Sequence, residues 1–163
     1  MAWSFERCRH SMTGQSGMSG MRKTIFVVLA LVAMAAAIGV YMMIHMSPPD
    51  DLDLSRSKAT ANGLFQVTIA PESEPLRQGP LHAWILTVET PDGVPVEAAE
   101  IAIDGGMPQH GHGLPTSPAV TGSLGDGRYR IEGVRFNMGG WWELKFAIAA
   151  DGRMDEVDFN IVL

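Results

Sequence analysis

A run of 23 residues without Asp, Glu, Lys or Arg limits most strongly what this chain can fold into. It covers residues 24–46 and reads TIFVVLALVAMAAAIGVYMMIHM. As an α-helix it would be about 34 Å long at 1.5 Å per residue, and the hydrocarbon core of a bilayer is about 30 Å thick. The run therefore predicts one transmembrane helix near the N-terminus.

The charges on either side of this run predict its orientation. Arg22 and Lys23 directly precede it, whereas aspartates at positions 50, 51 and 53 follow it. Because positively charged flanks stay in the cytoplasm, the N-terminus is expected there and everything after residue 46 outside it. We therefore predict a single-pass protein of the inner (plasma) membrane, with its C-terminal domain in the periplasm or another extracytoplasmic space.

A cleaved signal peptide is the alternative to an uncleaved signal-anchor. Residues 33–35 (Ala-Met-Ala) and 35–37 (Ala-Ala-Ala) each offer small side chains in the pattern of a cleavage site. The apolar character continues past them to Ile44, which is longer than the apolar region of a usual signal peptide. An anchor over residues 24–46 is therefore the favoured interpretation.

The segments on either side of the anchor are expected to lack a packed core. Residues 1–23 are rich in Ser, Gly and Met and predict a disordered cytoplasmic N-terminus, with Met21 as an alternative true start that would leave Cys8 and His10 out of the protein. Residues 47–62 contain Pro-Pro and alternating charges and predict a linker. Cys8 is the only cysteine, so the chain can form no internal disulfide, and a blue-copper centre on the outer side would lack its thiolate.

The charge of the outer part excludes one class of partner. Residues 47–163 contain 8 Lys and Arg against 17 Asp and Glu, a net charge of −9, whereas residues 1–46 contain 4 against 1, a net charge of +3. An acidic domain is repelled by phosphate backbones and by anionic lipid surfaces. Nucleic acid is therefore not an expected partner.

Residues 63–163 show the pattern of short strands separated by Gly, Pro and Asp. His82, Trp84, Leu86 and Val88 alternate along one candidate strand, and no amphipathic helix is evident. This pattern predicts an all-β, immunoglobulin-like antiparallel sandwich of about seven strands. The candidate strands cover residues 64–69, 81–90, 99–104, 127–136, 141–149 and 154–163, and the predicted core is Trp84, Leu86, Val88, Ile101, Ile103, Tyr129, Ile131, Phe136, Leu144, Phe146 and Ile148.

Candidate metal ligands stand in the expected connection between two of these strands, residues 105–125. Met107, His110 and His112 occur within six residues, and Gly111 between the histidines allows the backbone to bend. Thioether sulfur together with imidazole favours Cu(I), whereas hard cations need carboxylates and carbonyls. The stretch therefore predicts a copper site; the alternative is that both histidines only cap a Gly/Pro turn.

Two further residues could add to such a site. Met138 lies in the loop 137–140, where two glycines follow it, and this loop could reach the same end of the sandwich. The alternative for Met138 is a gap-filling residue of the core. His82 in its strand is expected to be structural rather than a ligand. Trp141 and Trp142 are adjacent in a strand, so only one of them can face the core.

The residues quoted so far resemble a known family. The element M-P-x-H-x-H-G at residues 107–113 and the later N-M-G-G-W at residues 137–141, within a likeness over about residues 81–163, resemble the YtkA-like domain. That family is similar to the FixH-type membrane-anchored proteins that accompany copper handling and cytochrome oxidase assembly. The resemblance implies an extracytoplasmic sandwich over residues 63–163 with a copper site at Met107, His110, His112 and Met138, but it names no reaction.

Catalysis is not expected from this sequence. There is no nucleophile elbow G-x-S-x-G and no cysteine outside the membrane, and Asp104 is the only carboxylate close in sequence to the histidine pair. Two hypotheses remain. The first is a Cu(I) carrier or chaperone for a membrane metalloprotein, with the copper ion itself as ligand. The second is a metal-free interaction domain that docks to a membrane-protein partner.

Overall fold

The computed structural model describes residues 17–46 and 48–163, which fall into two compact units, an N-terminal helix and a C-terminal β domain. Helix α1 spans Gly17–Met46. Its segment Gly20–Met43 is long and apolar enough to cross a membrane and is a candidate anchor. Residues 17–23, expected to be disordered, therefore belong to the helix, and Cys8 and His10 lie outside the described residues.

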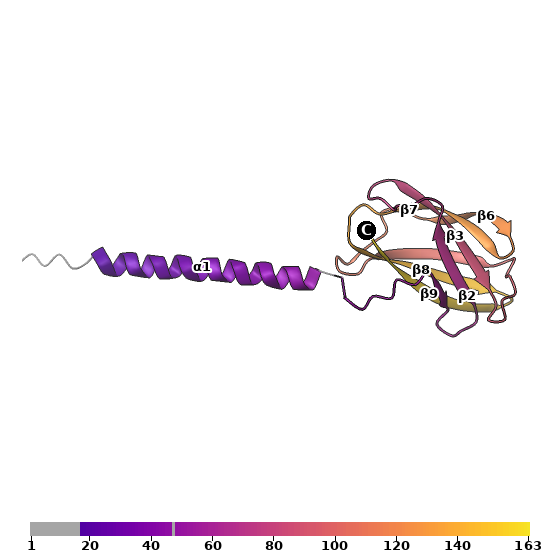
Figure 1. Cartoon of the computed structure of the whole chain (residues 1–163), viewed down its shortest axis with the longest axis horizontal. Helices are drawn as coiled ribbons and strands as arrows, with labels where there is room; N and C mark the ends of the chain where they lie inside the picture. Colours follow the sequence, from indigo (N-terminus) through magenta and orange to yellow (C-terminus); the bar gives the residue numbers. More distant parts are fainter. Residues whose placement is uncertain (1–16, 47) are drawn as a thin grey trace, which may run out of the picture. The chain divides into compact units, whose positions relative to one another are not determined.

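The C-terminal unit is an antiparallel β-sandwich, which confirms the predicted fold class. One sheet has the strand order β1-β2-β3-β7-β6 and the other β5-β4-β8-β9, and the two layers are visible in Figure 1. The strands in the described part of the chain are β1 (Ser57–Ala59), β2 (Gln66–Pro71), β3 (Leu81–Glu89), β4 (Glu100–Met107), β5 (His112–Gly113), β6 (Ala119–Gly125), β7 (Arg128–Arg135), β8 (Trp141–Ala150) and β9 (Arg153–Val162).

The described part of the chain has nine strands, whereas about seven were predicted. Three of the nine show little alternation of apolar and polar residues in the sequence. Strand β1 has three residues and β5 has two. Strand β6 is a sheet edge with two register irregularities against β7, and its residues are mostly exposed. The prediction that residues 105–125 form one long connection was therefore wrong: β4 extends to Met107, and β5 and β6 occupy much of the rest.

Alternating side chains of the two sheets form the core between them. Nine of the eleven predicted core residues are buried, with Trp84, Leu86 and Val88 of β3 all at 1% exposure or less. The exceptions, Ile101 and Ile103, are half-buried and pack against the edge of the core. They lie in the first half of β4, where the two-residue strand β5 does not reach, so one side of each is uncovered.

The segment expected to be a linker, residues 47–62, is partly folded onto the sandwich. Its residues 57–59 are strand β1, and the turn that follows is held by the buried carboxylate of Asp155. That carboxylate accepts the side-chain and backbone N–H groups of Asn62 at 2.8–3.1 Å and the backbone N–H of Leu64 at 3.2 Å. Burial raises the pKa of Asp155, but the hydrogen bonds from Thr60 and from three backbone N–H groups outweigh it and hold this pKa well below its usual range.

We expect Asp155→Asn to destabilise the domain at neutral pH and to flatten its acid dependence. A depressed pKa in the folded state contributes stability above the unfolded value, near 3.9, and this contribution is lost as the pH falls toward the folded value. Denaturant unfolding of residues 48–163 from pH 7 to pH 2 measures both effects. Asp151→Asn, at an exposed turn position where no such bonds are formed, is the control and should follow the wild type. Equal curves for all three proteins would contradict the role given to Asp155.

Candidate functional site

The predicted ligands Met107, His110 and His112 lie on the hairpin that joins β4 to β5. The carbonyl of Met107 accepts the backbone N–H groups of His110 and Gly111, both at 3.0 Å, which closes a tight turn. Pro108 occupies the second position of this turn, where its fixed φ is favourable, and Gly111 has a φ of 66°, which favours glycine. The residue types M-P-x-H-G-H therefore fit a tight hairpin as well as a ligand list.

Close backbone approach also requires glycine at the base of the hairpin. Gly106 pairs with Gly113, and a Cβ at Gly106 would lie 2.4 Å from the carbonyl oxygen of His112. Because that oxygen belongs to the backbone, it cannot move aside without separating the two strands. The glycines before and after the histidines thus hold His112 in register with Met107.

The hairpin register places Met107 and His112 side by side. They are directly paired across β4 and β5, and paired residues of antiparallel strands project to the same face. Met107 is 1% exposed and belongs to the core, whereas His112 is exposed and His110 is half-buried. The two imidazole rings stack, with centroids 5.6 Å apart and an interplanar angle of 20°. Among the described residues neither ring has a hydrogen-bond partner, so the structure gives them no turn-capping bond.

Met138 lies at the same end of the sandwich as this hairpin, in the loop between β7 and β8. The Cε atom of Met107 would be 3.3 Å from a Cβ built on Gly140, so the buried thioether side chain of Met107 ends against this loop. The indole of Trp142 donates to the carbonyl of Met138 at 3.1 Å and fixes the loop from below. Met138 itself is 36% exposed, so it is not a core residue. The four predicted ligands are therefore gathered at one end of the sandwich.

The spacing of the two imidazoles is compatible with one shared ion. With metal–nitrogen bonds of about 2.0–2.1 Å, two imidazoles on one ion have ring centroids roughly 5–6 Å apart. The stacked rings already have this separation but would have to turn so that their nitrogens face each other. In the described part of the chain, no three His, Cys, Asp or Glu side chains are grouped as metal ligands, so an ion held here would need a thioether as well.

Two other residues considered in the sequence lie elsewhere. His82 has its Nε2 at 2.8 Å from the carbonyl oxygen of Arg77, and its ring packs against Phe136 at 5.7 Å, which is a structural environment. Asp104 accepts the backbone N–H of Gly105 and lies on the outer face of its sheet, away from the side on which Met107 projects.

Residues from β8 that the sequence did not point to also border the hairpin. A shallow depression of about 380 Å³ is lined by hairpin residues together with Glu143 and Lys145. These two were missed because they lie more than thirty residues from the histidines; the pairing of Gly106 with Glu143 could be found only from the strand register.

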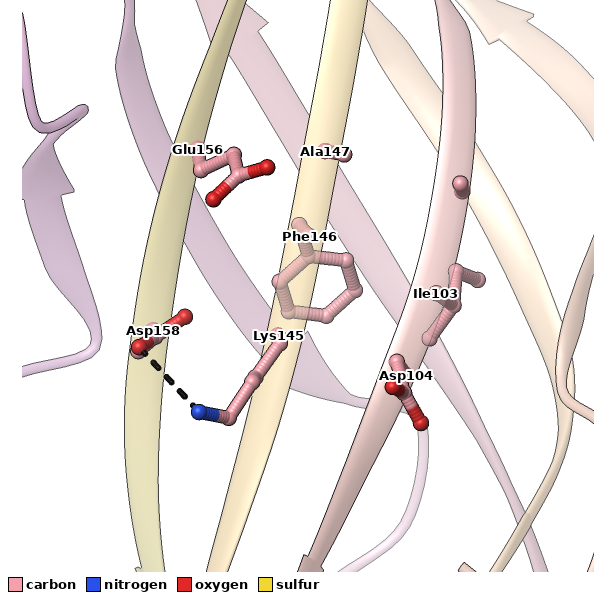
Figure 2. Close-up of a pocket in the computed structure, with 8 residues that line it drawn as sticks. Ile103, Asp104, Lys145, Phe146, Ala147, Glu156 and Asp158 are labelled. Carbon is pink, nitrogen blue, oxygen red and sulfur yellow. Dashed lines mark ion pairs between the residues drawn. The ribbon is translucent and has the colours of Figure 1, made fainter.

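The outer face of the same sheet has a second depression, of about 320 Å³, next to the first. Figure 2 shows Asp104, Glu156 and Asp158 around it, with Lys145 directed toward Asp158 at 3.7 Å. A closer hydrogen bond to Glu143, at 3.2 Å, together with Asp158 raises the pKa of Lys145. Lys145 is common to both depressions, so the hairpin borders directly on this acidic surface.

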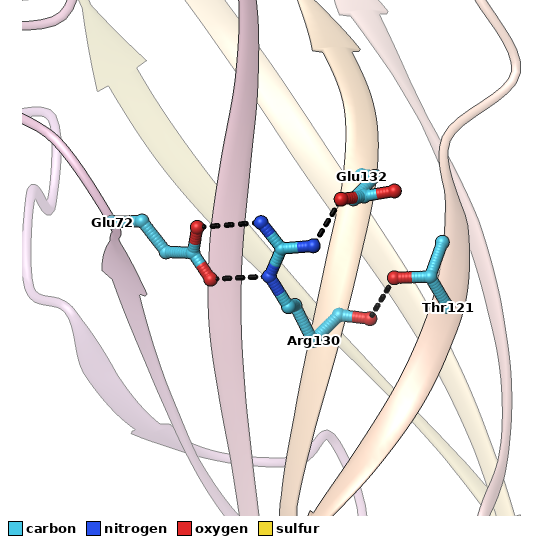
Figure 3. A network of polar contacts seen from close by, with 4 residues as sticks. All are labelled: Glu72, Thr121, Arg130 and Glu132. Carbon is cyan, nitrogen blue, oxygen red and sulfur yellow. Dashed lines mark hydrogen bonds and ion pairs between the residues drawn. The ribbon is translucent and has the colours of Figure 1, made fainter.

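The outer face of the other sheet has an ion-pair network centred on one arginine. Figure 3 shows Arg130 of β7 between Glu72 and Glu132. Its Nε and Nη2 donate to the two carboxylate oxygens of Glu72 at 2.5 and 2.8 Å, and this pairing lowers the pKa of Glu72. The network holds the start of the β2–β3 loop to β7. The guanidinium group of Arg130 is already bonded to both carboxylates.

These observations define a β-sandwich with a histidine- and methionine-bearing loop end, attached to a candidate membrane anchor. The YtkA-like family model matches residues 59–147, and the chain belongs to this family. No curated protein matches the chain. Among solved structures, the ZirS C-terminal domain is similar over 72% of this chain and 83% of that one, with 15% identity and a TM-score of 0.38.

Proposed function

We propose that this protein is a membrane-anchored, extracytoplasmic Cu(I) carrier that delivers copper to, or receives it from, a membrane metalloprotein. Helix α1 is the candidate anchor, and the charges around it favour an outward-facing β domain. The proposed role is binding and transfer rather than catalysis. It agrees with what the resemblance noted in the sequence implies, namely a likeness to FixH-type proteins that accompany copper handling and oxidase assembly.

One observation carries this proposal: the hairpin brings two imidazoles to 5.6 Å from each other and places one of them in register with a methionine. Imidazole and thioether together are a soft ligand set, which suits Cu(I) better than hard cations. Met138, exposed in the β7–β8 loop at the same end of the sandwich, could supply a second thioether. An ion held by these groups would lie near the surface, as exchange with a partner requires.

Titration of the soluble fragment 48–163 with Cu(I) against a competing chelator tests the proposal. We expect one tightly bound Cu(I) per chain, and weaker binding of Zn²⁺ in a parallel titration. Binding should weaken in acid, because an imidazole that has taken up a proton on its ligating nitrogen is no longer a ligand. A fragment that takes no Cu(I) from the chelator would refute the carrier and leave the metal-free docking domain as the better hypothesis.

A further inference from the structure

Strand β4 has an unpaired edge along most of its length. In the sheet β5-β4-β8-β9 it pairs with β8 on one side, but β5 on the other side reaches only its last two residues. The chain turns away from β4 after Leu114: Pro115 follows, which has no N–H, and the hydroxyl of Thr116 donates to a carbonyl of β7 in the other sheet at 2.6 Å. In the described part of the chain no strand therefore pairs with this side of residues 100–105, which we call the open edge.

The backbone N–H and C=O groups of Ile101 and Ile103 point outward from the open edge. The carbonyl of Gly105 accepts the N–H of Leu114 at 3.0 Å, so the odd-numbered residues of β4 direct their polar groups away from β8. The N–H of Gly105 is satisfied by the carboxylate of Asp104 at 2.7 Å. Among the described residues, Ile101 and Ile103 have no such partner, so their backbone groups are available to another strand.

The opposite side of the sandwich, between β1 and β9, is protected against such pairing. Two basic side chains point inward there. The guanidinium carbon of Arg56 lies 5.0 Å from the ring centroid of Trp84, and the ammonium nitrogen of Lys58 lies 5.7 Å from that of Phe159. Inward-pointing charges at a sheet edge are a known protection, because an added strand would bury them.

The open edge lacks these protections. Strand β4 pairs with β8 in a continuous register, whereas β6, the edge of the other sheet, has two register irregularities. The side chains that β4 directs inward along the open edge are Ile101 and Ile103, which are half-buried and pack against the core. A regular edge with apolar inward side chains is a template for the addition of a strand.

Acidic side chains predominate on the outer face beside the open edge. Glu100 and Asp104 are exposed on β4 itself, and neither is ion-paired within the described part of the chain. Lys145 is 3.2 Å from Glu143 and 3.7 Å from Asp158, and Figure 2 shows it turned toward Asp158 rather than Asp104. On the outer face of this sheet, that lysine stands against Glu100, Asp104, Glu143, Glu156 and Asp158.

Neighbouring segments do not reverse this charge. Residues 105–125, which include β5 and β6, contain no Asp, Glu, Lys or Arg. Beyond β6, Arg128 lies 3.8 Å from Asp126. Arg153 lines a depression together with Glu100, but the acidic Asp151 lines it as well. The open edge is therefore bordered by net negative charge.

We propose that the open edge binds an extended segment of a partner protein as an added strand, and that basic and apolar side chains alternate along this segment. The apolar side chains cover Ile101 and Ile103 beside the core, and the basic ones lie on the outer face beside Glu100 and Asp104. Because side chains of a strand alternate between two faces, only an alternating sequence satisfies both requirements. The proposal does not depend on copper.

A second copy of this chain fits the open edge less well. A twofold pairing of two open edges about Ala102 would place Glu100 of each copy opposite Asp104 of the other, and like charges directly opposite destabilise a sheet. The net charge of −9 on residues 47–163 opposes this pairing further. The charge pattern thus favours a basic segment of a different protein.

Amide hydrogen exchange, followed by NMR on the full chain in detergent micelles, tests the proposal. In the free protein the amides of Ile101 and Ile103 should exchange fast, whereas those of Ala102 and Asp104, which face β8, should be protected. The probe is a capped peptide of alternating lysine and valine. At ten times its Kd it should slow exchange at Ile101 and Ile103 by about tenfold, and added salt should weaken its binding. A peptide of the same composition, with lysines and valines in separate blocks, should protect neither amide.

An inward-pointing charge should close the open edge. Ile103→Lys gives β4 the kind of side chain that Lys58 provides in β1, and it should reduce the affinity for the alternating peptide by about tenfold or more. Val120→Lys, at a half-buried position of β6, is the matched control and should leave that affinity unchanged. Thermal unfolding of each variant verifies that it is folded.

Removal of the two carboxylates tests the charge pattern without touching the core. Glu100→Gln with Asp104→Asn should lower the peptide affinity by at least about twofold and remove most of its salt dependence, because both side chains are exposed beside the added strand. Asp50→Asn with Asp92→Asn, at two exposed turn positions, changes the net charge equally and should have little effect.

The opposite results would overturn the proposal. They are protection of Ile101 and Ile103 in the free protein, no protection by the alternating peptide, equal protection by the block peptide, or protection at β6 or β1 instead. Pairing of β4 between two copies of the chain would also overturn it. Failure of the copper proposal would look different, since the chain would bind no Cu(I) while the peptide still protected the open edge.

Discussion

The double variant His110→Ala, His112→Ala is expected to lose Cu(I) affinity by more than about 100-fold and to keep its fold. Loss of the groups that only orient a metal-binding histidine already costs about 10–100-fold, and this variant removes both imidazoles themselves. Stability should change little, because His112 is exposed, His110 is half-buried, and the bonds that close the turn are formed by the backbone. Competition with a Cu(I) chelator and denaturant unfolding measure the two properties separately.

The remaining histidine of the domain provides the matched control. His82 is bound to a backbone carbonyl and packs on Phe136, so His82→Ala should reduce stability but leave Cu(I) affinity nearly unchanged. For the thioethers, Met138→Ala should weaken binding and relax the preference for Cu(I) over Zn²⁺, whereas Met154→Ala, at the far end of the sandwich, should do neither. Equal affinity in the wild type and the double histidine variant would leave the metal hypothesis without support.

Much of the fold could be predicted from the sequence because long strands leave a clear alternation. Trp84, Leu86 and Val88 in β3, and Leu144, Phe146 and Ile148 in β8, are spaced by two, and all six are buried. Strands β1 and β5 could not be predicted, since two or three residues cannot show a period. Their formation depends on neighbours distant in sequence, namely β2 for β1 and the end of β4 for β5.

The sequence proposes which residues form the candidate site, but it does not show how deeply each of them is buried. His110 and His112 were grouped in the sequence as candidate ligands two residues apart, and the structure brings their rings together as a stacked pair. Nothing local showed that Met107 would be a core residue at 1% exposure, because this follows from the extension of β4 under the hairpin. Likewise Glu143 reaches the hairpin only through the register of β8 with β4.

Replacement of Trp142 by alanine is expected to reduce the free energy of unfolding by about 3–5 kcal/mol, the usual range for a buried aromatic side chain. Trp142 is 0% exposed and packs edge-on against Phe136, with ring centroids 5.4 Å apart. Because domains of this size are stable by only about 5–15 kcal/mol, such a loss removes a large part of the total stability. Denaturant titration of fragment 48–163 measures it.

The adjacent tryptophan distinguishes a specific role of Trp142 from a general effect of losing an indole. Trp141 projects to the other face of β8, is half-buried and donates its N–H to Asn160, so Trp141→Ala should cost clearly less. A greater loss from Trp141→Ala than from Trp142→Ala would contradict the assigned faces. Trp142→Phe keeps most of the packing but removes the bond to the carbonyl of Met138. This bond fixes the loop that contains Met138 to the core. We therefore expect Trp142→Phe to weaken Cu(I) binding while it lowers the free energy of unfolding only slightly.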